Sequence, residues 1–154
     1  MTTYEHTQRG ALHLILLGIA AAVGIGAIVL GGIPPAKFGL MSLSVALALV
    51  AACFAQLTVR DRGDRLTVRY GWLPLFGWSC RWEDIESAEP GRSAWIDGWG
   101  MHWVPGRGIT INLWGLDCVV LCVKGRTVRI GTDDPAGLTD YVRQRIAEQR
   151  SNPA

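Results

Sequence analysis

Two long apolar stretches occupy the first third of the chain and set it apart from the remainder. Residues 10–36 and 38–59 contain no Asp, Glu, Lys or Arg, and Lys37 lies between them. A helix needs about 20 apolar residues to cross the hydrocarbon core of a bilayer. The Gly-Gly-Ile-Pro-Pro sequence at 31–35 favours a turn between the two stretches. The pattern therefore predicts a hairpin of two membrane-spanning helices, at about residues 11–32 and 38–57.

A cleaved signal peptide is the alternative explanation of the first stretch. The apolar core of a signal peptide is usually about 7–15 residues long and is followed by a cleavage site. Residues 11–33 form a longer run, and a second apolar stretch follows almost at once. The hairpin is therefore the favoured interpretation.

Beyond residue 57 the pattern changes to short alternating segments, which are typical of β-strands. The sequence Leu-Thr-Val-Arg occurs at 57–60 and again at 66–69, on either side of a Gly-containing turn, and predicts a β-hairpin. A strand is expected from Trp78 to about Trp82, whereas residues 89–107 are rich in Gly and irregular. Turns at Gly115 and at Lys124-Gly125 separate three further predicted strands, which are Ile109–Trp114, Cys118–Val123 and Arg126–Ile130.

A helix is predicted at the C-terminal end. Asp134 is a favourable N-cap residue and Pro135 suits the first helical position. The apolar stripe of this helix consists of Leu138, Tyr141, Val142 and Ile146. The chain thus divides into an N-terminal tail at 1–10, the hairpin at 11–57, a small α+β domain at 58–149 and a disordered tail at 150–154.

Three short patches resemble a known family. They are Trp82-Glu83-Asp84-Ile85, then Gly98-Trp99-Gly100-Met101, and the sequence from Ile130 to Leu138 at the start of the last helix. In these patches, and in its helical hairpin, the chain resembles bacterial membrane proteins with a pleckstrin-homology-like domain, over residues 57–149. The resemblance implies an antiparallel β-barrel of six or seven strands, capped by the C-terminal helix. It also implies a bacterial inner-membrane location and little about activity.

The positions of Lys and Arg near the spans predict the orientation, because cytoplasmic loops carry an excess of both. Lys37 is the cation of the connecting loop, whereas Arg9 precedes the first span and four arginines follow the second, at 60, 62, 65 and 69. Both termini are therefore expected in the cytoplasm.

Small residues recur at every fourth position in both spans. Gly18, Ala22 and Gly26 form such a stripe in the first span, and Ser44, Ala48 and Ala52 form one in the second. Stripes of this kind allow helices to approach closely. Two alternatives stay open: the stripes pack against each other within one hairpin, or one of them docks on another membrane protein or on a second copy.

Recognisable catalytic and metal-binding motifs are absent from the sequence. It contains no GxxxxGK loop, no HExxH and no GxSxG. The lone His102 and the acidic run from Glu83 to Glu89 are expected to be surface or packing residues. Four cysteines without a CxxC pair argue against zinc. Residues 57–154 contain thirteen Lys and Arg against twelve Asp and Glu, so no basic field large enough for nucleic acid is expected. No cofactor is therefore expected, and an enzyme is a distant alternative.

Three surfaces of the domain are candidates for binding. The apolar connection between two predicted strands is expected to anchor the domain at the membrane interface or, equally, to pack into the barrel; its residues are Trp72, Leu73, Leu75, Phe76 and Trp78. The irregular segment contributes tryptophans and arginines, which dominate binding hot spots, and we expect it to bind a protein partner through Arg92, Trp95, Trp99, Trp103 and Arg107. A basic tip comprises Arg60, Arg62, Arg65, Lys124 and Arg126 and suits an acidic protein partner.

Together these features predict a non-catalytic, membrane-tethered interaction or scaffold protein. Its partners would be membrane lipids and a membrane protein, as an accessory subunit of a larger complex, or a second copy of the chain. A lipid-binding module that senses the membrane surface is the alternative function.

Overall fold

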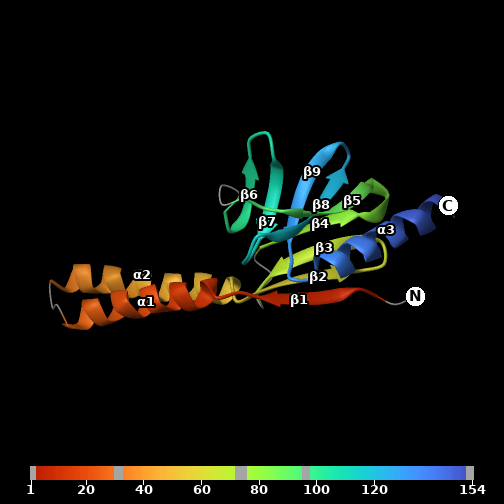
Figure 1. The fold of residues 1–154 in the computed structure, drawn as a ribbon. Coiled ribbons are helices and arrows are strands. Elements are labelled where there is room, and N and C mark those ends of the chain that lie inside the picture. The colour runs from red at the N-terminus through yellow and green to blue at the C-terminus, as the bar shows by residue number, and fades with distance from the viewer. Residues whose placement is uncertain (1–2, 30–32, 72–75, 95–97, 152–154) are drawn as a thin grey trace.

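The computed structural model describes residues 3–29, 33–71, 76–94 and 98–151, and it consists of a helical hairpin that projects from a β domain (Figure 1). Helix α1 spans Leu12–Val29 and helix α2 spans Pro34–Cys53. At 1.5 Å per residue, their 18 and 20 residues give lengths of about 27 and 30 Å. Pro34 and Pro35 lie in the first turn of α2, where a missing N–H removes no helical hydrogen bond.

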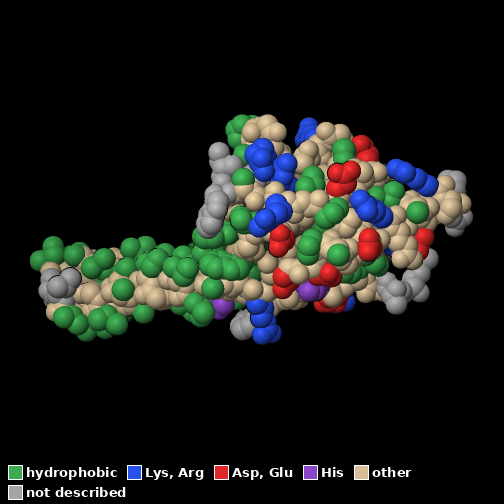
Figure 2. Space-filling view, viewed as in Figure 1, with side chains coloured by type: hydrophobic (Ala, Val, Ile, Leu, Met, Phe, Trp, Pro, Cys, Tyr) green, Lys and Arg blue, Asp and Glu red, His purple; other side chains and the backbone are tan. Residues whose placement is uncertain are grey.

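Both helices are long and apolar enough to span a membrane. Only 11% of each apolar window is buried, so neither is the core helix of a soluble domain. Figure 2 shows the large hydrophobic side chains along the hairpin surface, with the charged side chains gathered on the β domain. The predicted pair of apolar helices is thus present, and α2 begins and ends four residues earlier than expected.

Small residues do line the contact between the two helices, but on a different face of α1 from the predicted one. The hydroxyl of Ser44 donates a 2.7 Å hydrogen bond to the carbonyl of Ala20, and Ala20 and Ala27 are buried. A Cβ added to Gly24 would lie 2.9 Å from the Ser44 hydroxyl oxygen.

The predicted stripe of α1 lies outside this contact. Gly18 and Ala22 are exposed, and a Cβ added to Gly18 or Gly26 would meet no atom within 4 Å. On α2, Ala48 is half-buried and Ala52 is exposed. In the structure, α1 therefore contacts α2 through Ala20, Gly24 and Ala27, and not through the stripe expected to pack inside the hairpin.

Four antiparallel strands form the first sheet, in the order β1-β2-β3-β4. Their bounds are Glu5–Arg9 for β1, Gln56–Asp61 for β2, Arg65–Tyr70 for β3 and Gly77–Arg81 for β4. Strand β1 lies in the expected N-terminal tail, for which the sequence predicted no strand. It has no apolar alternation to mark it, and it forms because its backbone pairs with β2 from Glu5–Arg60 to Arg9–Gln56.

The second sheet contains five strands in the order β5-β8-β9-β7-β6. A 3₁₀ turn, η1 at Trp82–Asp84, leads into it, and the strands are β5 (Ile85–Arg92), β6 (Gly100–Val104), β7 (Gly108–Asn112), β8 (Asp117–Val123) and β9 (Arg126–Gly131). Strand β7 pairs in parallel with β9 and antiparallel with β6. The turn at Gly115 is present, but the strands on either side of it, β7 and β8, do not pair, so an all-antiparallel arrangement is wrong.

The β domain differs from the expected architecture. The described strands form two sheets of four and five strands, and no closed barrel is seen among them. The expected barrel of six or seven antiparallel strands is therefore replaced by two sheets. Strand β1 extends the first sheet, and the β7–β9 pair in the second sheet is parallel.

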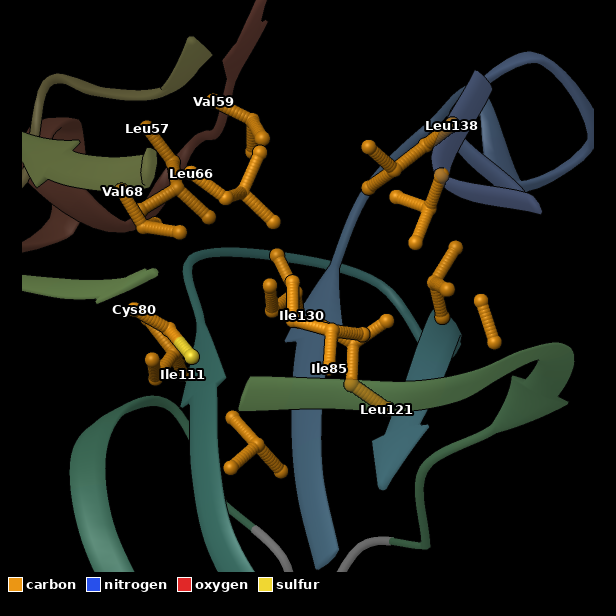
Figure 3. Packing of buried hydrophobic residues seen from close by; sticks show 14 of the residues in the cluster. Leu57, Val59, Leu66, Val68, Cys80, Ile85, Ile111, Leu121, Ile130 and Leu138 are labelled. Atoms are coloured by element: carbon orange, nitrogen blue, oxygen red, sulfur yellow. The ribbon is translucent and has the colours of Figure 1, made fainter. Parts of the chain in front are cut away.

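Helix α3 spans Pro135–Ser151 and packs against β5, β8 and η1. The carboxylate of Asp134 accepts a 3.0 Å hydrogen bond from the Gly137 N–H, so the predicted N-cap is confirmed. Leu138, Val142 and Ile146 are buried, as the apolar stripe predicted. Figure 3 shows Leu138 above the core, in which Leu57, Leu66 and Val68 of the first sheet face Ile111 and Ile130 of the second.

Both ends of the hairpin are fixed to the β domain at its base. The Gly71 N–H donates to the Gln56 carbonyl at 2.7 Å, and a Cβ on Gly71 would lie 2.6 Å from the Cys53 carbonyl oxygen. The ring of Phe54 packs against Tyr70, with a centroid distance of 5.3 Å. Because β1 enters α1 and α2 leads into β2, the hairpin is inserted between two neighbouring strands.

Candidate functional site

A buried carboxylate joins three elements of the β domain. Asp61, at the end of β2, accepts hydrogen bonds from Trp82 Nε1 at 2.9 Å, from the Tyr141 hydroxyl at 2.5 Å and from the Gly63 N–H at 2.6 Å. The Arg145 guanidinium lies 3.4 Å from the same carboxylate, and its central carbon lies 5.4 Å from the centre of the Trp82 ring. Asp61 is therefore fully occupied by partners from η1, α3 and its own turn.

The electrostatics of this cluster favour a permanent carboxylate. Burial opposes the ionisation of Asp61, but the hydrogen bonds from Tyr141 and Trp82 outweigh it and hold the pKa of the carboxyl below its ordinary value. Burial and the bond to Asp61 raise the pKa of the Tyr141 phenol. Both groups are thus held in one protonation state near neutral pH. Fixed protonation states favour a structural role for the Asp61–Tyr141 pair over a role in proton transfer.

The histidines do not assemble a catalytic or metal site in the part of the chain that the structure describes. His6 Nε2 lies 2.5 Å from Asp133 Oδ1, which ties β1 to the start of α3. His13 Nδ1 bonds the Gly10 carbonyl next to α1, and His102 lies on β6. Among the described residues, no group of three His, Cys, Asp or Glu side chains could hold a metal ion.

Two thiols outside the hairpin, those of Cys80 and Cys122, are poorly suited to nucleophilic chemistry. Burial, with a contribution from Asp84, raises the pKa of Cys80 to about 11. The Cys122 thiol donates to Glu86 at 3.1 Å, and this bond raises the pKa of Cys122. Both sulfurs are therefore protonated near neutral pH, whereas thiol nucleophiles react as thiolates.

The outer side of the first sheet is basic, because the alternation that places Val59 and Val68 in the core places arginines on the opposite side. We call it the basic face; its arginines are Arg9, Arg60, Arg62, Arg65, Arg69 and Arg81. Ion pairs join Arg60 to Glu5, Arg65 to Asp64 and Arg81 to Glu83, at 3.3, 2.7 and 2.9 Å. Six arginines against these three carboxylates leave a net charge of +3.

Two hollows of about 170 and 370 Å³ lie on the basic face and share Thr67 and Arg69. The smaller one extends from Arg62 to Gly71, at the base of the hairpin, and Arg60 and Thr58 also line it. Arginine and hydroxyl side chains of this kind are donors for carboxylate or phosphate oxygens. The predicted basic tip draws on both sheets, because Lys124 and Arg126 lie at the turn between β8 and β9, and Lys124 pairs with Asp84 at 3.0 Å.

The expected membrane-interface segment is described only in part, since Trp72, Leu73 and Leu75 lie outside the described residues. Phe76 is 43% exposed, and its ring stacks on Phe54 with a centroid distance of 6.3 Å. Trp78 pairs with Val68 across the first sheet and packs against the core. The two interpretations of this segment thus divide between its residues: Trp78 contributes to the core, and Phe76 is partly exposed beside the hairpin.

The described members of the expected partner-binding set are distributed over both edges of the second sheet. Trp95 lies outside the described residues, and Arg92, on β5, pairs with Asp117 at 3.4 Å. Trp103 lies on β6, at the opposite edge of the second sheet, and Arg107 lies in the turn between β6 and β7. Strands β5 and β6 form the two edges of this sheet, whereas Trp99 lines a small hollow together with Ala94, just beyond the end of β5.

A groove between β5 and α3 was not anticipated from the sequence. It encloses about 630 Å³, and Arg143 and Arg150 reach across it to the carbonyls of Ala88 and Glu86, at 2.9 and 3.1 Å. These bonds cover the free edge of β5, a common protection against unwanted strand pairing. The seven-residue spacing places both arginines on one helical face, and this signal was available in the sequence.

Comparison with the known protein families found no match to this chain, and the curated proteins include no sequence that matches it. The resemblance to the pleckstrin-homology-like family therefore stays an expectation based on short patches. The geometry of the described residues has to support any functional assignment.

Proposed function

We propose that this chain is an integral membrane protein of the bacterial inner membrane and that its β domain is a non-catalytic interaction module. The observation that supports this most directly is the insertion of the hairpin between β1 and β2, which are neighbours in one sheet. A domain attached through two strands is held at the bilayer surface in one orientation. A short tether is what an accessory subunit needs to present a surface to a neighbouring membrane protein.

In this proposal, the β domain and both termini lie in the cytoplasm. Arg9 and Arg69 lie close to the base of the hairpin, whereas Lys37 lies at its far end. The excess of positive charge on the domain side agrees with the distribution found in cytoplasmic segments. The two sheets and the packed C-terminal helix are compatible with a pleckstrin-homology-like domain, which we retain as a proposal for its ancestry.

The basic face is the surface that we assign to the protein partner, and an acidic segment is the chemistry that fits it. Three of its arginines are engaged by carboxylates, which leaves the net charge of +3 and two hollows beside Thr67 and Arg69. Complementary charge raises association rates and specificity. This assignment puts the basic face ahead of the surface that the sequence predicted around Trp99 and Trp103.

Co-purification tests the proposal. The tagged full-length protein is extracted from its native membrane in mild detergent, and associated proteins are identified by mass spectrometry. We expect a stoichiometric membrane-protein partner that is lost when Arg62→Glu and Arg69→Glu are combined. Arg126→Glu, an exposed charge reversal on the second sheet, is the matched control and should retain the partner.

A second double variant, Arg92→Glu with Arg107→Glu, tests the surface that the sequence predicted. Loss of the partner in this variant alone would move the interface to the second sheet. Recovery of the folded wild-type protein without any stoichiometric partner would contradict the interaction function.

Lipid recognition is a second candidate function, supported by the smaller hollow of the basic face. This hollow reaches Gly71 at the base of the hairpin and is lined by three arginines, two threonines and Glu5, whose carboxylate pairs with Arg60. A phosphate headgroup at the edge of the bilayer fits these donors. Native mass spectrometry of the full chain, released from nanodiscs of mixed lipids, should then show a retained anionic lipid. Arg69→Glu should remove it, and retention of zwitterionic and anionic lipid alike would reject this candidate.

A further inference from the structure

The edge strand β6 carries an exposed apolar surface that the core does not explain. Its described residues alternate: Gly100 and Val104 are buried, whereas Met101 and Trp103 point to the opposite side and are 42% and 67% exposed. Their cross-strand partners on β7 are Ile111 and Ile109. The apolar core thus continues through β7 to the free edge of the second sheet.

This surface begins where the hairpin enters the β domain. A Cβ added to Gly100 would lie 3.8 Å from the ring of Phe54, which caps the end of α2. The Trp99 ring, 41% exposed, stacks on Trp114 with a centroid distance of 5.1 Å. Trp114 also contacts the start of α1, because a Cβ on Gly10 would lie 2.7 Å from its Cβ. Residues 99 and 100 are therefore close to both ends of the hairpin.

The direction of β6 keeps it near this level. Figure 1 shows β6 at the end of the β domain from which the hairpin projects, running across the hairpin axis and not along it. Phe76, which stacks on Phe54, adds an exposed aromatic ring at the same base. A plane perpendicular to the hairpin at its base therefore passes close to β6, the strand that carries the exposed Met101 and Trp103.

We propose that this edge of the β domain, formed by Trp99, Met101 and Trp103 with Phe76, docks on the headgroup region of the bilayer that the hairpin crosses. The proposal rests on the hairpin spanning that bilayer. Lipid is the occupant that the structure favours, because the surface is continuous with the exposed apolar base of the hairpin and lies across its axis. Tryptophan suits this depth, since its ring is apolar and its N–H reaches the headgroups. Docking there would fix the tilt of the domain and the direction in which the basic face points.

Fluorine NMR of the full chain in lipid nanodiscs tests the proposal. Fluorotryptophan is incorporated at every Trp, the Trp103 and Trp82 resonances are assigned with Trp→Phe variants, and spin-labelled lipid is then added. We expect several-fold stronger broadening of Trp103 than of Trp82, which is completely buried in the core. A water-soluble gadolinium chelate should broaden Trp103 only weakly.

A Leu17→Trp variant places a reporter on the exposed surface of α1 and separates the two proposals. Broadening of this reporter by lipid, together with broadening of Trp103 by the chelate alone, would overturn the docking proposal and leave the membrane hairpin intact. Protection of Trp103 from both agents would indicate a protein or a second copy on β6 and would also overturn it. Failure of lipid to broaden the Leu17→Trp reporter would reject the membrane hairpin, and the docking proposal with it.

Met101→Ser provides a check that keeps Trp103 as the reporter. Because the variant removes apolar contact from the same exposed surface, the lipid broadening of Trp103 should fall. An unchanged value in a folded variant would count against docking.

Discussion

The hydroxyl of Tyr141 donates a 2.5 Å hydrogen bond to the carboxylate of Asp61, and this bond links α3 to the end of β2 across 80 positions of sequence. Trp82 donates to the other carboxylate oxygen from η1. One side chain thus joins the first sheet, the crossing to the second sheet and the C-terminal helix. Removal of the Asp61 carboxylate should therefore lower the stability of the whole β domain and not only that of the turn after β2.

Asp61→Asn should therefore destabilise the protein by about 2–4 kcal/mol, because an amide cannot accept all of these bonds and leaves Arg145 without its buried partner. Urea unfolding of the full chain in detergent, followed by tryptophan fluorescence, measures the change. Asp64→Asn is the matched control, since Asp64 is exposed and pairs with its sequence neighbour Arg65. Equal unfolding midpoints for the two variants would contradict the role of Asp61.

Acid should weaken the protein through the same residue. The pKa of Asp61 in the folded state lies below its ordinary value, so the unfolded chain takes up a proton first as the pH falls. The contribution of Asp61 to stability is complete above about pH 5 and is lost as the pH falls through the folded pKa. Unfolding midpoints of wild type and Asp61→Asn should consequently converge on acidification. A constant difference between them would show that ionisation is not involved.

The junction at Gly71 should be intolerant of a side chain. Gly71 has a φ of +59°, and a Cβ there would lie 2.6 Å from the Cys53 carbonyl oxygen. Gly63 has a φ of +91°, but a Cβ added to Gly63 would meet no atom within 4 Å. A side chain there would therefore strain the backbone without colliding with a neighbour. Gly63→Ala should cost about 1–2 kcal/mol from backbone strain alone. Gly71→Ala should cost at least about 3 kcal/mol or prevent folding.

Thermal unfolding of both variants in the same detergent measures this difference. Similar losses for the two variants would mean that the end of α2 can move away from β3. The close connection between the hairpin and the β domain would then be less rigid than the structure indicates.

Several elements could be predicted from sequence because one local signal determines each. Uninterrupted apolar runs identified α1 and α2, alternation around Gly63 identified β2 and β3, and the Asp134-Pro135 cap identified α3. Asp61 was assigned to the turn, although it follows Leu57 and Val59 at the period of two that faces the core. That spacing was the signal for a buried carboxylate.

Other features depend on contacts between distant parts of the chain. Strand β1 consists of polar residues, so its sequence does not mark it as a strand. The strand with which it pairs, β2, follows it in the sequence only after the whole hairpin. The parallel pairing of β7 with β9 passes over the intervening β8, so turn chemistry at Gly115 could not reveal it. Likewise, the apolar surface of β6 emerged only when the structure placed that strand at a sheet edge.

The two glycines of α1 that differ in environment provide a test of the hairpin contact. Gly24 faces Ser44, whereas the space beside Gly18 is open. Gly24→Leu should destabilise the helix pair by about 1–3 kcal/mol, because the added side chain has to push α2 away. Gly18→Leu should leave this pair unchanged. Thermal unfolding in detergent, with light scattering to measure the mass of the protein in the micelle, distinguishes the variants.

The mass measurement decides between the two uses of the stripe formed by Gly18, Ala22 and Gly26. If the stripe docks on a second copy, Gly18→Leu should convert an oligomer into a monomer without lowering the unfolding temperature of the hairpin. An unchanged mass would leave another membrane protein or lipid as the neighbour of this surface. A large loss of stability in Gly18→Leu, equal to that in Gly24→Leu, would instead show that α1 is rotated relative to α2 in the membrane and that the predicted stripe packs inside the hairpin after all.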